Sequence, residues 1–251
     1  MAGCDGGARR VAAGVAAAPT YHDLAIMSMD RGEVLRYMGY HGQGLGPDLG
    51  SRINEAMARC LEVSRPRAAV AVFEVAGRTD DGVPEVSLGG TPLVLRGSSI
   101  ARHLDGAIAA GVMAVTLGMG DERELHRLSL VDPVGQVLFD AASTTLVERA
   151  ADAAEALLVG AAAAGGLHCN VRFSPGYGDL PMDTQPPLLA ALGASRLGIT
   201  LSPTYLMTPT KSVTAVVGLF DTPQAGAHAS CADCLCSDFC IIRRTGTTCH
   251  G

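Results

Sequence analysis

The stretch that decides the fold is a short loop followed by a strand. Residues 172–181 read RFSPGYGDLP and residues 211–219 read KSVTAVVGL. Two prolines fix backbone angles and two glycines free others, so the loop forms a defined turn that exposes backbone N–H and C=O groups. Arg172 offers planar donors that suit a carboxylate or phosphate, and Tyr177 offers an aromatic face with a polar tip. A structural loop with a surface Arg172 and a core Tyr177 is the alternative interpretation.

The composition predicts one domain with two tails. The chain has 251 residues, which is enough for one sizeable core or two small ones. Hydrophobic residues make up 48% of it, but alanine supplies much of that share, aromatic residues only 4%, and tryptophan is absent. We therefore expect an aliphatic core in which helices pack closely over small residues.

The net charge limits the kinds of partner that the chain can bind, and the cysteines indicate the cellular compartment. Nineteen basic and 25 acidic residues give a net charge of −6, and no basic cluster interleaves with aromatic residues, so we expect no nucleic-acid partner. No apolar run reaches the roughly 18 residues of a membrane span, so we expect no membrane partner. Of eight cysteines, four lie between residues 231 and 240. Such grouped thiols suit a reducing compartment, and we expect a cytoplasmic protein.

The pattern of apolar residues predicts an α+β fold. Helical spacing indicates helices over 30–38, 49–61, 98–104, 132–164 and 183–192. Strands are predicted over 68–76, 92–95, 111–117, 197–201 and 212–219, with 92–95 forming a hairpin partner of 68–76 across the turn at 80–82. Because helices and strands do not alternate as βαβ units, we expect an antiparallel or mixed sheet with one long helix and several shorter helices.

Two side chains on the long predicted helix are acidic and share a side. Asp140 and Glu148 lie two turns apart, and charged residues on a long helix usually form a solvated face. Cys60 lies on the apolar stripe of the second predicted helix, where a buried thiol is expected. The glycine pair Gly118 and Gly120 lacks the lysine and the spacing of a phosphate-binding loop, so we predict no phosphate site there.

The loop and the strand after it resemble the reactivation domain of cobalamin-dependent methionine synthase. That domain carries an Arg-x-x-Pro-Gly-Tyr-x-x-x-Pro loop and then a Ser-Val-Ser-Gly strand, and the likeness extends from about residue 29 to residue 221. It is similar to small stand-alone relatives that carry this module as a separate polypeptide. The resemblance implies a methionine synthase activation domain-like fold over residues 28–221, between a disordered leader at 1–27 and a cysteine-rich tail at 222–251.

The resemblance also implies a binding site for S-adenosylmethionine. Arg172 would pair with the methionine carboxylate of the ligand and Tyr177 would face the corrinoid. The rest of the implied cofactor-binding set comes from the same loop: Ser174, Pro175 and Gly176.

Three positions depart from the pattern of the synthase domain. The aspartate that it uses for the ligand is Gly39 here, a glutamate on the long helix is Thr144, and an aromatic residue on the last strand is Val217.

The function that the resemblance implies is that of an accessory module for a cobalamin-dependent methionine synthase or another corrinoid protein. It would support reductive methylation of the corrinoid on that partner, and any enzymatic role would be that of a methyltransferase-type component. The cofactors would perform the difficult chemistry while the protein positions them. Two alternatives are an iron–sulfur or zinc protein that donates electrons to a corrinoid partner, and a non-catalytic scaffold.

The tail carries the pattern on which the electron-donor alternative rests. Cys231, Cys234, Cys236 and Cys240 lie close enough in sequence to converge on one zinc ion or iron–sulfur cluster. By the resemblance to the stand-alone relatives, Cys231, Cys234 and Cys240 are the core ligands; Cys236, Cys249 or His250 would complete the shell. The spacing matches neither a zinc ribbon nor a ferredoxin, and a thiol-rich tail without a ligand is the alternative.

Metal analysis tests the tail directly. In folded protein purified without oxygen, we expect near-stoichiometric zinc, or iron with acid-labile sulfide, bound through these thiolates. If folded protein held only traces of zinc and iron, the alternative interpretation, a thiol-rich tail without a ligand, would stand.

Overall fold

The computed structural model describes residues 18–40, 42 and 44–224, and its centre is a seven-stranded sheet. Its strands run in the order β4-β3-β2-β5-β9-β6, and β1 pairs with β2 beside this path. Every pairing is antiparallel, which confirms the predicted α+β class and its antiparallel form. The strands are β1 (Thr20–Asp23), β2 (Arg67–Thr79), β3 (Glu85–Leu88), β4 (Val94–Arg96), β5 (Ala109–Thr116), β6 (His168–Cys169) and β9 (Ser212–Phe220), with a separate hairpin of β7 (Thr200–Leu201) and β8 (Met207–Thr208).

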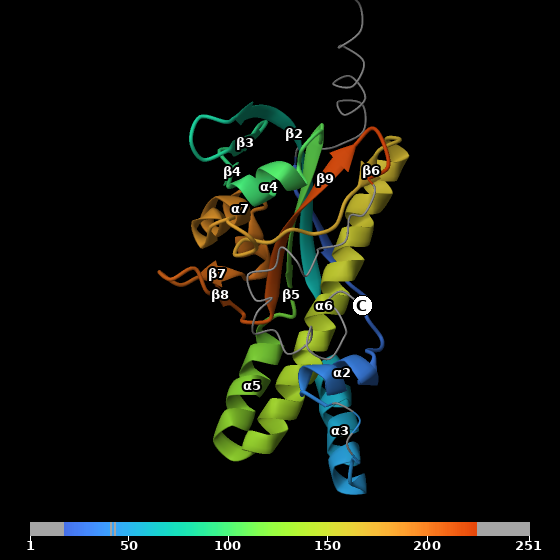
Figure 1. Ribbon diagram of the computed structural model, residues 1–251. Helices are drawn as coiled ribbons and strands as arrows, with labels where there is room; N and C mark the ends of the chain where they lie inside the picture. The colour runs from blue at the N-terminus through green and yellow to red at the C-terminus, as the bar shows by residue number, and fades with distance from the viewer. Residues whose placement is uncertain (1–17, 41, 43, 225–251) are drawn as a thin grey trace, which may run out of the picture.

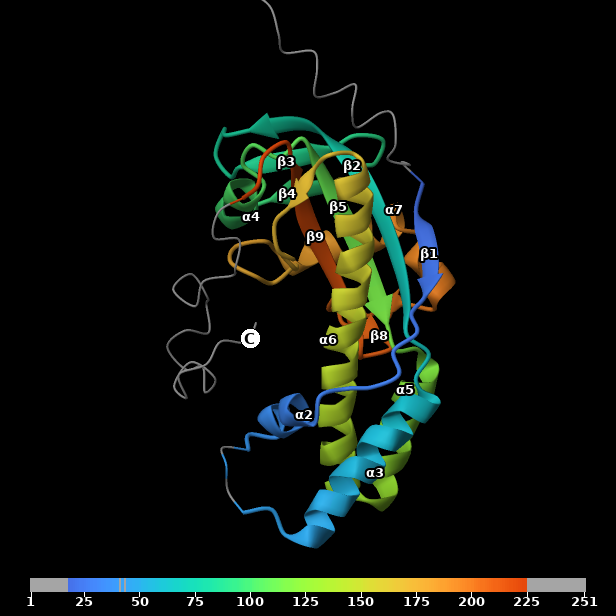
Figure 2. The same ribbon diagram turned by 90° about the vertical axis from the view of Figure 1, so that its right-hand side faces the viewer.

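One long helix lies along a face of this sheet. Helix α6 (Pro133–Ala164) has 32 residues, begins at the cap residue Asp132, which accepts a hydrogen bond from the Gly135 backbone, and extends past the strands (Figures 1 and 2). At 1.5 Å per residue it is about 48 Å long. The other helices are α2 (Arg31–Tyr37), α3 (Pro47–Val63), α4 (Ser98–His103), α5 (Met119–Val131) and α7 (Gln185–Ala191), with short 3₁₀ turns η1 (Met182–Thr184) and η2 (Ala194–Leu197).

The sheet has a core on each face because its strands alternate their side chains. On β5, Met113 and Val115 join the core beneath α6, whereas Val112 and Ala114 join the core beneath α4 and α7. Gly111 faces Leu158 of α6 so closely that a Cβ there would lie 3.0 Å from a Leu158 methyl carbon. The lack of a side chain at Gly111 therefore lets α6 pack this close to the sheet at that point.

The part of α6 beyond the sheet forms a helical lobe with α2, α3 and α5 (Figure 2). Cys60 of α3 is fully buried there, as predicted, beside the side chains of Ser64, Asp121 and Ser143. Burial raises the pKa of the Cys60 thiol to about 12. This thiol is a structural side chain rather than a reactive one.

Several predicted elements differ from those in the structure. The hairpin partner of β2 across the turn is β3, and the segment predicted for that role pairs with β3 instead, as β4. Helix α5 was missed because its apolar stripe is weak and its first turn contains Gly120. Of the strand predicted over 197–201, only the two-residue β7 is a strand; Leu197 ends η2, and residues 198 and 199 connect the two elements.

The boundary predicted at residue 28 is too late. Strand β1 lies inside the predicted leader and pairs with β2 from Thr20 to Asp23. Residues 1–17 and 225–251 lie outside the described residues. Within the described ranges, every helix is too short or too polar to cross a lipid bilayer.

Two glycines in helices provide a matched test of this packing. A Cβ on Gly120 would collide with the carbonyl oxygen of Val63, where the start of α5 meets the end of α3. We expect Gly120→Ala to lower the free energy of unfolding by about 2 kcal/mol, measured by urea denaturation, because neither backbone can move freely.

Gly160→Ala is the control. Gly160 is an exposed residue of α6 with no atom within 4 Å of a Cβ placed on it. Alanine should raise the free energy of unfolding there by about 0.5–1 kcal/mol. Equal effects of the two substitutions would contradict the contact between α3 and α5.

Candidate ligand-binding site

The loop at 172–181 runs across β9 and is attached to it through the backbone (Figure 1). The backbone groups of Phe173 and Val216 exchange two hydrogen bonds of 2.8 Å. Within the loop, Gly176 donates its N–H to the carbonyl of Leu180, also at 2.8 Å. Gly176 and Gly178 have φ values of 93° and 51°, which L-residues rarely adopt. The predicted tight turn is therefore present and its shape depends on its glycines.

The far end of the loop caps helix α4. The carboxylate of Asp179 accepts hydrogen bonds from the backbone N–H of Ser98 at 2.7 Å and of Ser99 at 2.8 Å. These bonds, that of Ser99 most strongly, lower the pKa of Asp179. The loop is thus fixed to two separate elements, β9 and α4.

Tyr177 lies at the outer side of the loop. Its side chain is 48% exposed, and its ring meets the Phe173 ring edge-to-face at a centroid distance of 6.0 Å. The interpretation of Tyr177 as a core residue is therefore wrong. A half-exposed aromatic ring of this kind can contact a planar ligand.

Arg172 lies beneath the loop and faces α6. Its side chain is 18% exposed and forms ion pairs with Asp152 at 2.7 Å, Glu155 at 3.0 Å and Glu148 at 3.4 Å. Burial works to lower the pKa of Arg172, but the hydrogen bond with Asp152 and the charges of Glu155 and Glu148 outweigh it, so the pKa is raised. The guanidinium is fully charged and engaged.

These three ion pairs restrict how the guanidinium of Arg172 can bind a ligand. A ligand carboxylate would have to replace a protein carboxylate on the guanidinium. Glu148 is the partner most easily replaced, because its contact is the longest of the three and its side chain is 45% exposed. The sequence did not predict this competition.

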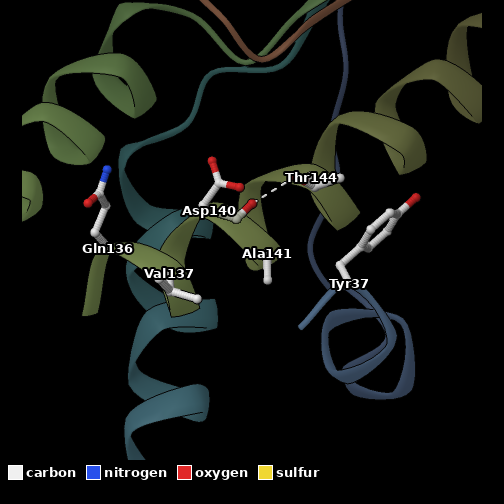
Figure 3. A pocket seen from close by; sticks show the side chains of 6 residues that line it. All are labelled: Tyr37, Gln136, Val137, Asp140, Ala141 and Thr144. Atoms are coloured by element: carbon white, nitrogen blue, oxygen red, sulfur yellow. Dashed lines mark hydrogen bonds between the residues drawn. The ribbon is translucent and has the colours of Figure 1, made fainter. Parts of the chain in front are cut away.

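A hollow of about 350 Å³ lies between α2 and α6 (Figure 3). Tyr37 of α2 lies across from the α6 side chains, and Thr144 donates to the carbonyl oxygen of Asp140 at 2.9 Å. The Tyr37 pKa is raised, first by burial and then by the charge of Glu148. Thr144, which lines the hollow, and Glu148, which pairs with Arg172, are one helical turn apart on α6. The lining residues are Tyr37, Gln136, Val137, Asp140, Ala141 and Thr144.

Lys211 closes the inner side of this region, and the sequence interpretation did not single it out. Its ammonium group lies 2.8 Å from a carboxylate oxygen of Asp140 and donates to the Thr144 hydroxyl at 2.9 Å. Asp140 and Glu148 are half-exposed, as expected of a solvated face, but each also pairs with a buried cation. In the sequence, the spacing of eight residues between Asp140 and Glu148 already indicated that the two side chains share one side of α6.

Of the three positions that depart from the resemblance, only Thr144 lines the hollow. Gly39 follows α2 with a φ of 73° and no atom within 4 Å of a Cβ placed on it. Val217 lies on β9 and is fully buried beneath α6. The hollow therefore lacks the two acidic side chains that the resemblance would place beside it.

The predicted metal ligands cannot be placed. Cys231, Cys234, Cys236 and Cys240 lie outside the described residues, as do Cys249 and His250. Within the described ranges, no group of three or more His, Cys, Asp and Glu side chains could hold a metal ion. Metal binding by the tail stays a prediction from sequence.

Comparison with known proteins identifies a similar fold. No protein-family model and no curated protein sequence matches the chain. Among solved structures, it is similar to the reactivation domain of MetH bound to AdoHcy, with a TM-score of 0.59 and 14% sequence identity. The similarity covers 93% of this chain and 88% of that one. At this identity the likeness establishes the fold, which is the activation domain-like fold predicted from the loop.

Removing Arg172 tests whether it fastens the loop to α6. We expect Arg172→Ala to lower the free energy of unfolding by about 2 kcal/mol, because Glu148, Asp152 and Glu155 would then face one another without a cation. Urea denaturation at low salt measures this loss.

Arg96→Ala is the matched control, because the ion pair of Arg96 with Glu85 is exposed. It should leave the free energy of unfolding nearly unchanged, because water already solvates both charges. Arg172→Ala with an equally small effect would show that the loop is held by its backbone bonds alone.

Proposed function

We propose that this chain binds S-adenosylmethionine between the 172–181 loop and α6, and supports the reductive methylation of a corrinoid held by a partner protein. The partner would be a cobalamin-dependent methionine synthase or another corrinoid protein. The observation that carries the proposal is that Arg172 and Tyr177 lie on one loop attached to β9, α4 and α6, in a fold similar to a reactivation domain bound to AdoHcy.

The residues of the chain can meet the chemical demands of such a ligand. Arg172 would bind the methionine carboxylate with parallel hydrogen bonds after Glu148 moves aside. Asp152 and Glu155 would then lie near the ligand's ammonium and sulfonium groups, which are cationic. Tyr177 would cover the ligand from the loop side, where its exposed ring excludes water.

The protein contributes orientation rather than acid–base chemistry. A corrinoid and an external reductant supply the chemistry: one electron reduces cob(II)alamin, and the methyl group moves from sulfur to cobalt, leaving S-adenosylhomocysteine. Such a transfer needs no proton from a side chain, so the work of the chain is to hold donor and acceptor together. A loop attached to β9, α4 and α6 is suited to that work.

A non-catalytic scaffold is the second candidate, and one observation favours it. Arg172 already has three carboxylate partners, and the acidic residues that the resemblance would place beside Tyr37 and on α6 are Gly39 and Thr144. A scaffold would keep the loop and its anchors without binding the ligand.

Reactivation in solution separates the two candidates. A cobalamin-dependent methionine synthase that lacks its reactivation domain would be converted to the cob(II)alamin form and incubated with reductant, S-adenosylmethionine and this chain. We expect methylcobalamin to return, measured by its absorbance, faster than in the absence of the chain. Arg172→Lys should weaken S-adenosylhomocysteine binding, measured by calorimetry, roughly tenfold, because lysine cannot form the parallel pair.

Arg96→Ala serves as the control here too, because Arg96 lies on β4 and pairs only with Glu85 among its charged neighbours in the described residues. It should bind and reactivate like the unchanged chain. If folded protein binds neither S-adenosylmethionine nor S-adenosylhomocysteine and leaves the rate of recovery unchanged, the scaffold function stands instead.

A further inference from the structure

A partly buried histidine contacts the loop that carries the proposed site. His103 is the last residue of α4, and its ring contacts the Phe173 ring at a centroid distance of 4.9 Å. Phe173 in turn meets Tyr177 at 6.0 Å. The three rings are therefore in contact one after another, from the end of α4 to the exposed side of the loop.

The loop holds both ends of the helix on which His103 lies. Asp179 caps the first turn of α4 at Ser98 and Ser99, and Phe173 packs on the ring at its last residue. Asn170, at the start of the same segment, donates to the backbone carbonyl of His103 at 2.7 Å. A movement of the His103 ring would therefore be transmitted to Phe173 rather than absorbed by a mobile helix.

The surroundings of the Nε2 atom of His103 disfavour the protonated form of the ring. Its Nε2 atom is buried and has no hydrogen-bond partner among the described residues. The backbone of Val171 raises the pKa of the ring, but by less than burial lowers it. Protonation would place a second N–H on Nε2 with no acceptor, and a buried unpaired donor is strongly disfavoured.

The charged groups around His103 do not offer an acceptor either. On its own helix the neighbour is Arg102, and from β2 the guanidinium of Arg78 donates to the carbonyl oxygens of Leu104 and Ala107. Strand β9 carries no ionisable side chain. Of the ionisable groups of the loop, Asp179 is bound to Ser98 and Ser99 at the other end of α4, Arg172 pairs with carboxylates of α6, and Tyr177 contacts Phe173. Burial lowers the pKa of His103 from its ordinary 6.5 to about 4, against the opposing bond with Val171.

We propose that His103 is a positioning residue for the proposed site: its neutral ring supports Phe173, and Phe173 holds the Tyr177 ring in place for the ligand. The part of this proposal that concerns the ligand rests on the proposed function. Because the folded state resists protonation of His103, acid favours states in which the ring is released. The loop should loosen as the pH falls from about 6.5 toward about 4.

Hydrogen exchange measured by mass spectrometry on the peptide that covers 172–181 tests the proposal without any ligand. The unchanged chain is compared with His103→Gln, which can still donate to Val171 but cannot gain a proton, and with His103→Phe, which keeps an aromatic ring. The intrinsic rate of exchange depends on pH in the same way in all chains outside the substituted position. Comparing the chains with one another at each pH therefore removes this dependence. On acidification we expect the unchanged chain to lose protection in this peptide while at least one folded variant keeps it.

His126→Phe is the control, because His126 is exposed on α5, away from the loop. It should show the same pH profile as the unchanged chain. Equal acid-induced loss of protection in the unchanged chain and both His103 variants would overturn the proposal, as would protection in the unchanged chain that does not change with pH.

Calorimetry with S-adenosylhomocysteine adds the functional readout. Between neutral pH and about pH 5, its affinity should fall for the unchanged chain and for His126→Phe but hold for His103→Gln. The same fall in all three chains would contradict the positioning role. Absence of binding to every chain at neutral pH would refute the proposed function, while hydrogen exchange would still decide whether His103 holds the loop.

Discussion

The ion pairs of Arg172 with the carboxylates of α6 join the two halves of the site. The loop at 172–181 is tied to β9 by the Phe173 backbone and to α4 by Asp179, but Arg172 fixes its distance from the long helix. Helix α6 also forms one wall of the hollow beside Tyr37, so the same helix carries the partners of Arg172 and part of the hollow's lining.

The same contact makes ligand binding an exchange of partners. A free arginine in a pocket would attract a carboxylate directly, whereas Arg172 must give up part of an existing network. Its half-exposed partners Glu148 and Asp152 lose little when they return to water, while Glu155 is 22% exposed and has more to lose. A cationic ligand would compensate the freed carboxylates, which favours S-adenosylmethionine over an uncharged molecule of the same shape.

Much of the fold was predictable because the local sequence signals and the pattern of buried residues indicate the same helices and strands. The Asp132 cap and the alanine-rich stripe define α6, and the β-branched residues of β5 and β9 define the centre of the sheet. Helix α5 and strand β1 were missed because tertiary contacts stabilise them more than their own patterns do: Gly120 fits against Val63, and β1 exists through pairing with β2. The loop was predictable from its proline and glycine spacing, but the partners of Arg172, the Lys211 contacts and the position of His103 depend on segments far apart in sequence.

A crystal structure of the chain grown with S-adenosylhomocysteine tests the central claim most directly. The account predicts the ligand between the 172–181 loop and α6, its carboxylate on the guanidinium of Arg172 in the place of Glu148, and its length covered by Tyr177. A ligand bound elsewhere, or a saturated crystal in which Arg172 keeps all three carboxylate partners and no ligand lies beside it, would contradict the account.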